Sequence, residues 1–197
     1  MAATPCCTSM AEFKYDPLSS DQPVSFRLDA NSDSFVFPSG KSYFKAFRLP
    51  DKEFPFRIHV KSFVLGDKYT AHIFYPQIAL LDDRFTVCKL SDPGDFALRK
   101  AGIKETASES WWLMRIKLEG SMQVDIPDAK YLVIYTTKEL LRNTSQYMAK
   151  QIQPLPIPIP GGVLIGAVPA GELPVAIPNS PFGWISITLE SLKDGYD

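Results

Sequence analysis

The chain is poor in the residues that carry most enzyme chemistry. Its 197 residues include only 2 histidines and 3 cysteines. His59 alternates with Arg57 and Lys61 on the polar face of a predicted strand, a setting that disfavours a proton-accepting base, and His72 lies on another predicted strand. No nucleophile has a suitable base near it in the pattern. We therefore expect no enzymatic activity and no catalytic residues.

An excess of one charge and a long apolar run are also missing. The 21 Lys and Arg are balanced by 22 Asp and Glu, which gives a net charge of −1 and argues against nucleic-acid binding. No run of eighteen apolar residues exists, so no transmembrane segment is predicted. No basic region followed by an apolar stretch begins the sequence, so no signal peptide is visible. Asp82 and Asp83 lack the ligand spacing of a calcium loop, and we expect no metal and no cofactor.

The few cysteines leave alternatives open. Cys6 and Cys7 are adjacent, and Cys88 lies on a predicted strand. This spacing does not match a zinc site. A disulfide is the favoured interpretation, either between Cys6 and Cys7 or from one of them to Cys88. The adjacent pair could also be the remnant of a lipid-anchor site, although the apolar residues that precede such a site are missing.

What is present is a series of short apolar or alternating segments separated by turn residues. These predict strands at about 24–28, 35–37, 42–49, 54–64, 71–80, 85–90, 111–120, 131–137 and 182–190. Segment 131–137 is apolar on both faces, which predicts a central strand that is covered on both sides. Short helices are predicted over Asp95–Ala101 and over 138–150, the second with a capping box at 136–139. The fold class is all-β: an antiparallel β-sandwich, immunoglobulin-like or jelly-roll-like, with one or two short helices.

One region has a biased composition. Residues 153–181 hold eight of the seventeen prolines and no Lys, Arg or His. Because proline lacks a backbone donor, the region cannot form a central strand, and we predict a long Pro-rich loop that lies extended over the sandwich. The predicted organisation is a lead-in over residues 1–23 and a single β-sandwich domain over residues 24–197 that includes this loop.

Aromatic residues supply the candidate binding site. Strand phase places Trp184 and Trp111 on polar faces, and it places Trp111 with Arg115. With Tyr75, these residues predict a ligand-binding site in which rings stack on a sugar and Arg115 serves as the polar companion. The alternative is that loop 153–181 covers the tryptophans as part of a satellite core.

An ordered set of pieces resembles the maltose operon periplasmic protein (MalM) family. The pieces are Tyr131–Leu141, Tyr147–Lys150, the Ile-Pro repeat over Pro156–Pro160, Gly183–Leu189 and, more weakly, Tyr75–Asp82. The start of the chain, with Cys6-Cys7, departs from the maltose-linked member. The resemblance implies an exported envelope protein of Gram-negative bacteria, periplasmic or associated with the outer membrane, with a lipid anchor in some members. It implies a non-enzymatic role in maltodextrin-type transport with an oligosaccharide or an envelope protein as partner. The alternative function is a protein–protein interaction scaffold or a lipoprotein unrelated to sugar uptake.

Overall fold

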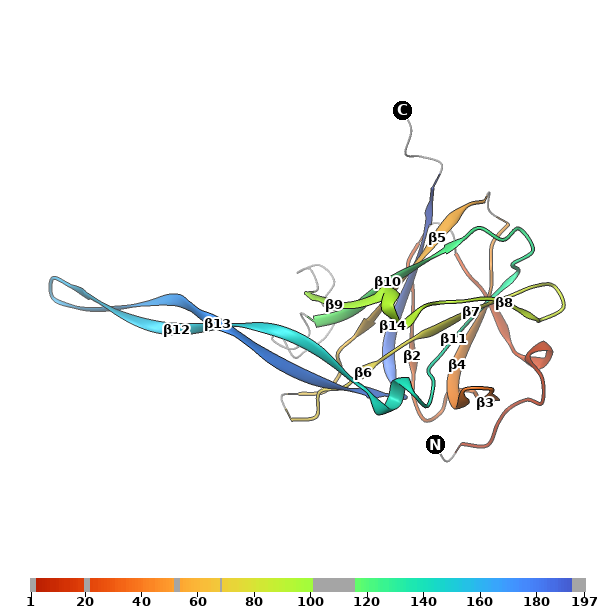
Figure 1. The fold of residues 1–197 in the computed structure, drawn as a ribbon, viewed down its shortest axis with the longest axis horizontal. Coiled ribbons are helices and arrows are strands. Elements are labelled where there is room, and N and C mark those ends of the chain that lie inside the picture. Colours follow the sequence, from red (N-terminus) through yellow and green to blue (C-terminus); the bar gives the residue numbers. More distant parts are fainter. Residues whose placement is uncertain (1–2, 20–21, 52–53, 68, 101–115, 193–197) are drawn as a thin grey trace.

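Two large β-sheets pack face to face, and a two-stranded arm projects from one end of them (Figure 1). The computed structural model describes residues 3–19, 22–51, 54–67, 69–100 and 116–192. The first sheet contains, in spatial order, β1 (Tyr15–Pro17), β4 (Gly40–Arg48), β11 (Tyr131–Tyr135), β7 (Gln77–Leu81) and β8 (Val87–Leu90), with β3 (Ser34–Phe37) also paired to β4. The second contains β2 (Val24–Leu28), β14 (Gly183–Ser191), β5 (Phe56–Phe63), β10 (Ile116–Val124) and β9 (Phe96–Lys100). Pairing within both sheets is antiparallel except between β1 and β4, so the predicted all-β antiparallel sandwich is confirmed.

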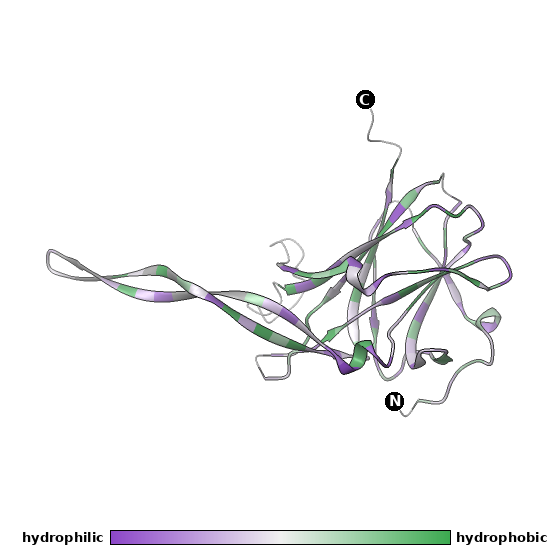
Figure 2. Cartoon of the chain, in the orientation of Figure 1, coloured by the Kyte–Doolittle hydropathy of each residue, from purple (hydrophilic) through white to green (hydrophobic). Residues whose placement is uncertain are grey.

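The main core lies between the two sheets, and strand β5 shows how the sequence specifies it. Phe56, Ile58 and Val60 are fully buried, while the alternate residues Arg57 and His59 stay partly exposed. This is the period of two that the sequence predicts for a strand with one face on a core. The same alternation of apolar and polar residues is visible along the sandwich strands in Figure 2.

A second core covers the outer face of the first sheet. β11 lies between β4 and β7, with Leu132 and Ile134 in the main core and Val133 and Tyr135 in the second. Phe13, from the N-terminal segment, packs over this outer face. The prediction of a central strand covered on both sides is therefore confirmed for β11.

The N-terminal segment makes specific contacts with the sandwich. β1 pairs in parallel with β4, and both Phe13 and Leu18 are buried. The division of the chain into a lead-in and one domain at residue 23 stays a prediction.

Both predicted helices are wrong. Between 138 and 150 there is only a short 3-10 turn, η4 (Leu140–Arg142), and the chain then enters strand β12 at Thr144. Thr137 Oγ1, not Thr136, accepts a hydrogen bond from the Leu140 amide at 3.1 Å. The helix that the sequence pattern predicts does not form, because residues 144–150 are hydrogen-bonded to a partner strand.

The second predicted helix, over Asp95–Ala101, is replaced by one 3-10 turn and a strand. The turn η2 (Pro93–Asp95) has a capping box in which Asp92 Oδ1 accepts from the Gly94 amide at 2.8 Å and Asp95 Oδ2 accepts from the Asp92 amide at 3.2 Å. The chain then pairs with β10 as strand β9. A third turn, η1 (Met10–Glu12), lies near the N-terminus. No helix among the described residues has the length and apolarity that crossing a membrane requires.

The Pro-rich segment is a β-hairpin, which corrects the prediction of a loop draped over the sandwich. β12 (Thr144–Ile159) and β13 (Gly162–Ser180) pair in antiparallel fashion and form an arm that extends away from the two sheets (Figure 1). Pro160 and Gly161 form its turn, and Gly161 has the positive φ of +92° that position i+2 of a type II turn requires. A β-bulge with one extra residue on β13, beside Gly171 at φ +109°, divides the arm into a proximal and a distal half.

The two strands of the arm accommodate their prolines because all of these prolines occupy the same class of position. The prolines within the two strands lie on alternate rungs of the ladder: Thr144–Pro178, Met148–Pro174, Ile152–Pro169, Pro154–Ala167, Pro156–Ile165 and Pro158–Val163. In an antiparallel pair, alternate rungs exchange no hydrogen bonds and their N–H groups point outward. Proline therefore removes only outward donors and leaves the ladder between the two strands intact. The prediction that the segment cannot form a central strand agrees with this arrangement, because both strands of the arm are edges.

The base of the arm is fixed to the sandwich. Ile177 is fully buried in the main core, and Asn179 and Ser180 pair in parallel with β6 (Ile73–Phe74). The Asn179 carboxamide donates to the Leu140 carbonyl and accepts from the Ser145 hydroxyl, both at 2.8 Å. The arm thus has a defined direction relative to the two sheets.

Candidate functional site

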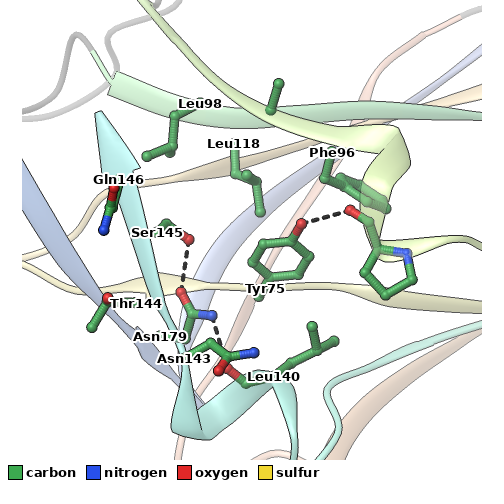
Figure 3. A pocket seen from close by; sticks show the side chains of 12 residues that line it. Tyr75, Phe96, Leu98, Leu118, Leu140, Asn143, Thr144, Ser145, Gln146 and Asn179 are labelled. Carbon is green, nitrogen blue, oxygen red and sulfur yellow. Dashed lines mark hydrogen bonds between the residues drawn. The ribbon is translucent and has the colours of Figure 1, made fainter. Parts of the chain in front are cut away.

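An open pocket of about 660 Å³ lies where the arm meets the edge of the second sheet (Figure 3). It is formed by the start of β12, the end of β13, the edge strand β9 and the segments before β7 and around η2 and η4. Its lining consists of Tyr75, Pro93, Phe96, Ala97, Leu98, Leu118, Leu140, Asn143, Thr144, Ser145, Gln146 and Asn179. None of these side chains carries a charge. Its exposed lining is mixed, with polar groups beside apolar ones, and its volume lies within the range of small-ligand sites.

Tyr75 forms one wall of the pocket. Its ring meets the Phe96 ring at a centroid distance of 5.9 Å in an edge-on arrangement, and its hydroxyl donates to the Pro93 carbonyl at 2.6 Å. Burial raises the pKa of the Tyr75 hydroxyl above its usual value, and the nearby carboxylates of Asp92 and Asp95 raise it further. The hydroxyl therefore stays protonated and the ring is held in a fixed orientation.

Carboxamides supply the polar part of the pocket. Asn179 is held by Ser145 and by the Leu140 carbonyl, as described above, and these two bonds appear in Figure 3. Asn143 and Gln146 are exposed, and neither side chain has a hydrogen-bond partner among the described residues. A carboxamide both donates and accepts, so these two groups can bind a neutral polyhydroxylated ligand. Sequence reasoning missed all three residues, because isolated Asn and Gln carry no spacing signal.

Trp184 lies on a different surface. Its neighbours Ile185 and Ile187 are fully buried in the main core, so Trp184 faces outward from the second sheet and is 42% exposed. Tyr75, by contrast, packs against the main core on the inner side of that sheet. The structure therefore does not bring Trp184 and Tyr75 together. It also leaves Trp184 uncovered, because the Pro-rich segment extends away as the arm.

Two further predicted site residues cannot be placed. Trp111 and Arg115 lie outside the described residues. Their role in ligand binding stays a prediction.

The histidines have ordinary structural contacts. His59 Nε2 lies 2.7 Å from Glu190 Oε2 on the outer face of the second sheet, and Arg57 lies 3.6 Å from the same oxygen. The hydrogen bond to His59, with its charge, lowers the pKa of Glu190 below its usual value. His72 Nδ1 lies 2.8 Å from the Thr70 carbonyl. No cluster of three His, Cys, Asp or Glu that could hold a metal occurs in the part of the chain that the structure describes.

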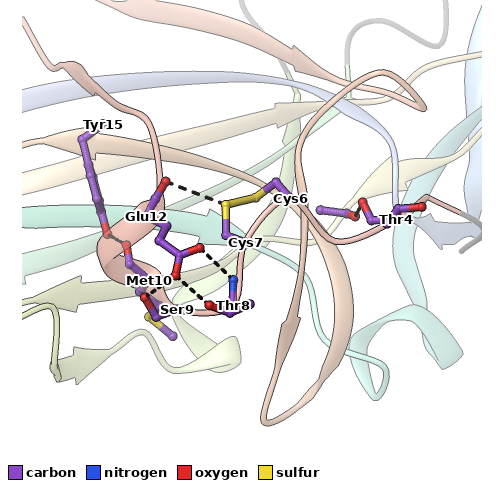
Figure 4. The surroundings of a disulfide bond; sticks show 9 residues. Thr4, Cys6, Cys7, Thr8, Ser9, Met10, Glu12 and Tyr15 are labelled. Carbon is purple, nitrogen blue, oxygen red and sulfur yellow. Dashed lines mark hydrogen bonds between the residues drawn. A yellow bond between two sulfur atoms is a disulfide. The ribbon is translucent and has the colours of Figure 1, made fainter.

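Cys6 and Cys7 form a disulfide (Figure 4). Cys88 is a free, exposed cysteine. Beside the disulfide, the Glu12 carboxylate accepts from the Thr8 amide at 3.0 Å, the Thr8 hydroxyl at 2.6 Å and the Ser9 hydroxyl at 3.2 Å. These bonds lower the pKa of Glu12 below its usual value, and the bonds from Thr8 contribute most. The disulfide thus lies in a locally ordered segment next to Phe13 of the second core.

Comparison with known proteins agrees with the resemblance in the sequence. The family model described as maltose operon periplasmic protein precursor (MalM) matches residues 39–153. This chain belongs to the MalM family. No curated protein and no solved structure gives a significant match. The matched range runs from β4 through the first half of β12, so it includes most of the sandwich and the Tyr75, Asn143 and Gln146 side of the pocket.

Proposed function

We propose that this protein is a periplasmic accessory component of carbohydrate uptake that acts by binding a neutral oligosaccharide, without catalysis. The observation that carries the proposal is the pocket at the base of the arm, whose described lining is uncharged and includes the Tyr75 ring and the carboxamides of Asn143 and Gln146. The family description, which names a maltose operon and the periplasm, supports the same ligand class and location.

The chemistry of the pocket suits a sugar better than an ion. A sugar ring has apolar C–H faces and a rim of hydroxyl groups, which an aromatic ring and carboxamides can bind respectively. Leu98 adds apolar surface, whereas Phe96 and Leu118 of the lining are buried in the main core. Among the described residues of this lining, an anionic ligand would find no cation and a cation would find no carboxylate. That composition favours neutral ligands.

Isothermal calorimetry with maltodextrins and with unrelated neutral glycans tests this proposal. The double variant Asn143→Ala, Gln146→Ala removes the two carboxamides from exposed positions, where truncation leaves the core unchanged. We expect it to weaken binding at least about tenfold, as two lost hydrogen bonds predict. Gln153→Ala, an exposed carboxamide on the arm outside the pocket, is the matched control and should bind like the wild type.

Trp184→Ala distinguishes the pocket from the outer face of the second sheet. Unchanged binding in this variant agrees with the pocket, whereas loss of binding there, with the double variant unaffected, would place the sugar on the Trp184 surface. The absence of heat with every saccharide would contradict the proposal as a whole.

A second candidate function is a protein–protein interaction scaffold in the envelope. It is favoured by the arm, on which Met148, Leu155, Ile165 and Leu173 are each about half exposed or more and no charge occurs between Lys150 and Glu172. Exposed apolar surface of this kind marks interaction sites. Short green apolar segments alternate with hydrophilic ones along part of the arm in Figure 2. Association with the outer membrane and a lipid anchor on the precursor stay predictions, which the leader encoded by the native gene would test.

A further inference from the structure

The two outer edges of the distal arm differ in their backbone donors. On β12, the outward positions are occupied by Pro154, Pro156 and Pro158, none of which has an N–H group. On β13, the outward positions opposite them are Ala167, Ile165 and Val163, and each has one. The β12 edge is therefore closed to strand addition, while the β13 edge offers three consecutive outward N–H groups with their carbonyls.

Within the described part of the chain, no other feature protects the β13 edge over residues 163–167. Edge strands commonly avoid pairing through charged residues, prolines, bulges or a covering segment. Residues 151–171 contain no charged residue, the bulge lies at the inner end of this stretch, and Ile165 is 75% exposed. An edge that is apolar, uncharged and rich in free donors favours the addition of a further strand.

We propose that the β13 edge pairs with the same edge of a second copy of this chain, in an antiparallel two-fold dimer centred on Ile165. In this register Ile165 faces Ile165 of the other copy, and Val163 and Ala167 face each other. The three rungs supply about six backbone hydrogen bonds. Pro169 at one end and the Pro160–Gly161 turn at the other limit the paired stretch to residues 163–167.

A second copy of this chain is the favoured partner of the β13 edge, because such an assembly ends at two chains. Pairing of β13 with β13 gives a four-stranded sheet whose two outer edges are both β12, and both lack outward donors over residues 154–158. A head-to-tail contact between β13 and β12, which would propagate into a filament, is prevented by the same prolines. Net charge does not oppose association either, since it is only −1 per chain.

The proposed pairing does not bring the two β-sandwiches of the dimer into collision. An antiparallel arrangement directs the two arms in opposite directions, so only their distal halves overlap. The proximal half of each arm, from Thr144 to Lys150, spans roughly 20 Å at the usual rise per strand residue and separates the sandwich from the paired region. Insertion of the arm into lipid is less favourable, because its unpaired backbone groups would be unsatisfied in hydrocarbon.

Molar mass measured by light scattering and sedimentation over a range of concentrations tests the dimer with the full chain. We expect a reversible dimer for the wild type and a dimer at least about tenfold weaker for Ile165→Pro, which removes the central edge donor. Ile165 already lies opposite Pro156, so a proline on this rung leaves the arm's own ladder intact. Ala176→Pro, on an equivalent rung of the proximal half, is the matched control and should dimerise like the wild type.

A crosslinking experiment tests the register. In a Cys88→Ser background, Ile165→Cys places two thiols opposite each other across the two-fold axis and should give disulfide-linked dimers, whereas Leu155→Cys on β12 should not. A wild type that stays monomeric at every concentration, dimerisation of Ile165→Pro with unchanged affinity, or binding of monomers to phospholipid vesicles through the arm would overturn the proposal. The dimer does not depend on the saccharide pocket, so calorimetry and molar mass test the two proposals separately.

Discussion

Gly183 and Phe74 approach so closely that no side chain fits between them. A Cβ atom placed on Gly183 would lie 2.2 Å from the Phe74 Cβ, and the Phe74 side chain is fully buried. Gly183 begins β14 and Phe74 belongs to β6, to which the base of the arm is paired. This contact thus joins the second sheet to the segment that holds the arm.

Gly183→Ala should therefore destabilise the fold. Neither the backbone of β14 nor the core-bound Phe74 can move without disturbing the main core, so we expect a loss of about 1–3 kcal/mol in the free energy of unfolding. Urea denaturation measures it. The matched control is Gly162→Ala at the tip of the arm, where a Cβ would meet nothing within 4 Å. Equal stability of the Gly183→Ala variant and the wild type would contradict the close packing.

Phe13 should be essential to the second core although it lies in the N-terminal segment. Its ring contacts the Phe35 ring edge-on at a centroid distance of 4.9 Å and lies 4.1 Å from the Phe44 ring, and the side chain is buried. Phe13→Ala leaves a cavity over the first sheet and should lower the free energy of unfolding by about 3–5 kcal/mol. Val36→Ala, which truncates an exposed side chain, should change it little. A Phe13→Ala variant as stable as Val36→Ala would show that the N-terminal segment does not cover the sheet.

The His59–Glu190 contact predicts a measurable pH dependence. Its hydrogen bond lowers the pKa of Glu190, so the contact stabilises the fold above the unfolded-state pKa of Glu190 and the effect is lost as the pH falls through the lowered folded-state pKa. We expect His59→Ala to raise the pKa of Glu190 towards its usual value in an NMR titration of the carboxyl carbon. Arg57→Gln should raise it less, because the Arg57 charge is the smaller cause. An unchanged pKa in His59→Ala would contradict the hydrogen bond.

Cys88 should react slowly despite its exposed position. Its Sγ donates to the Leu80 carbonyl at 3.3 Å, and burial of the sulfur raises the pKa of the thiol. At neutral pH the thiolate fraction is therefore smaller than that of a free cysteine, and the thiolate is the reactive form. We expect alkylation by iodoacetamide to be slower in the native protein than in the urea-unfolded chain, with a rate that rises at higher pH than usual. Equal rates in both states would contradict the shift.

Local periodicity predicts those parts of the fold that depend on one strand at a time. The alternation of Phe56, Ile58 and Val60 gives the buried face of β5, and the continuous apolar run of β11 gives a strand between two cores. The outward orientation of Trp184 follows from the same period of two. These features need no knowledge of the partner strand.

Features that depend on distant partners escape this reasoning. Residues 144–150 have a helical pattern, but they form a strand because residues 172–178, which include two prolines, pair with them. The pocket joins Tyr75 to Asn143 and Asn179, which are far apart in sequence. The sequence proposes Tyr75 as a site residue because aromatic rings can stack on sugars, whereas carboxamides give no comparable signal.

The alternation of rungs in the arm gives the last prediction. Leu155 lies one residue from Pro154 and Pro156, so it belongs to the rungs that exchange hydrogen bonds, and its N–H points towards Gly166. Leu155→Pro removes that donor and places a ring between the strands, whereas Ala176→Pro removes only an outward donor. Hydrogen exchange of the arm amides should accelerate at least about tenfold in Leu155→Pro and stay near the wild-type rate in Ala176→Pro. The melting temperature of the sandwich should be the same in both variants, because Leu155 is exposed and lies outside both cores. Equal exchange in the two variants would show that the prolines are not sorted by rung, and the difference between the β12 and β13 edges would then lose its physical basis.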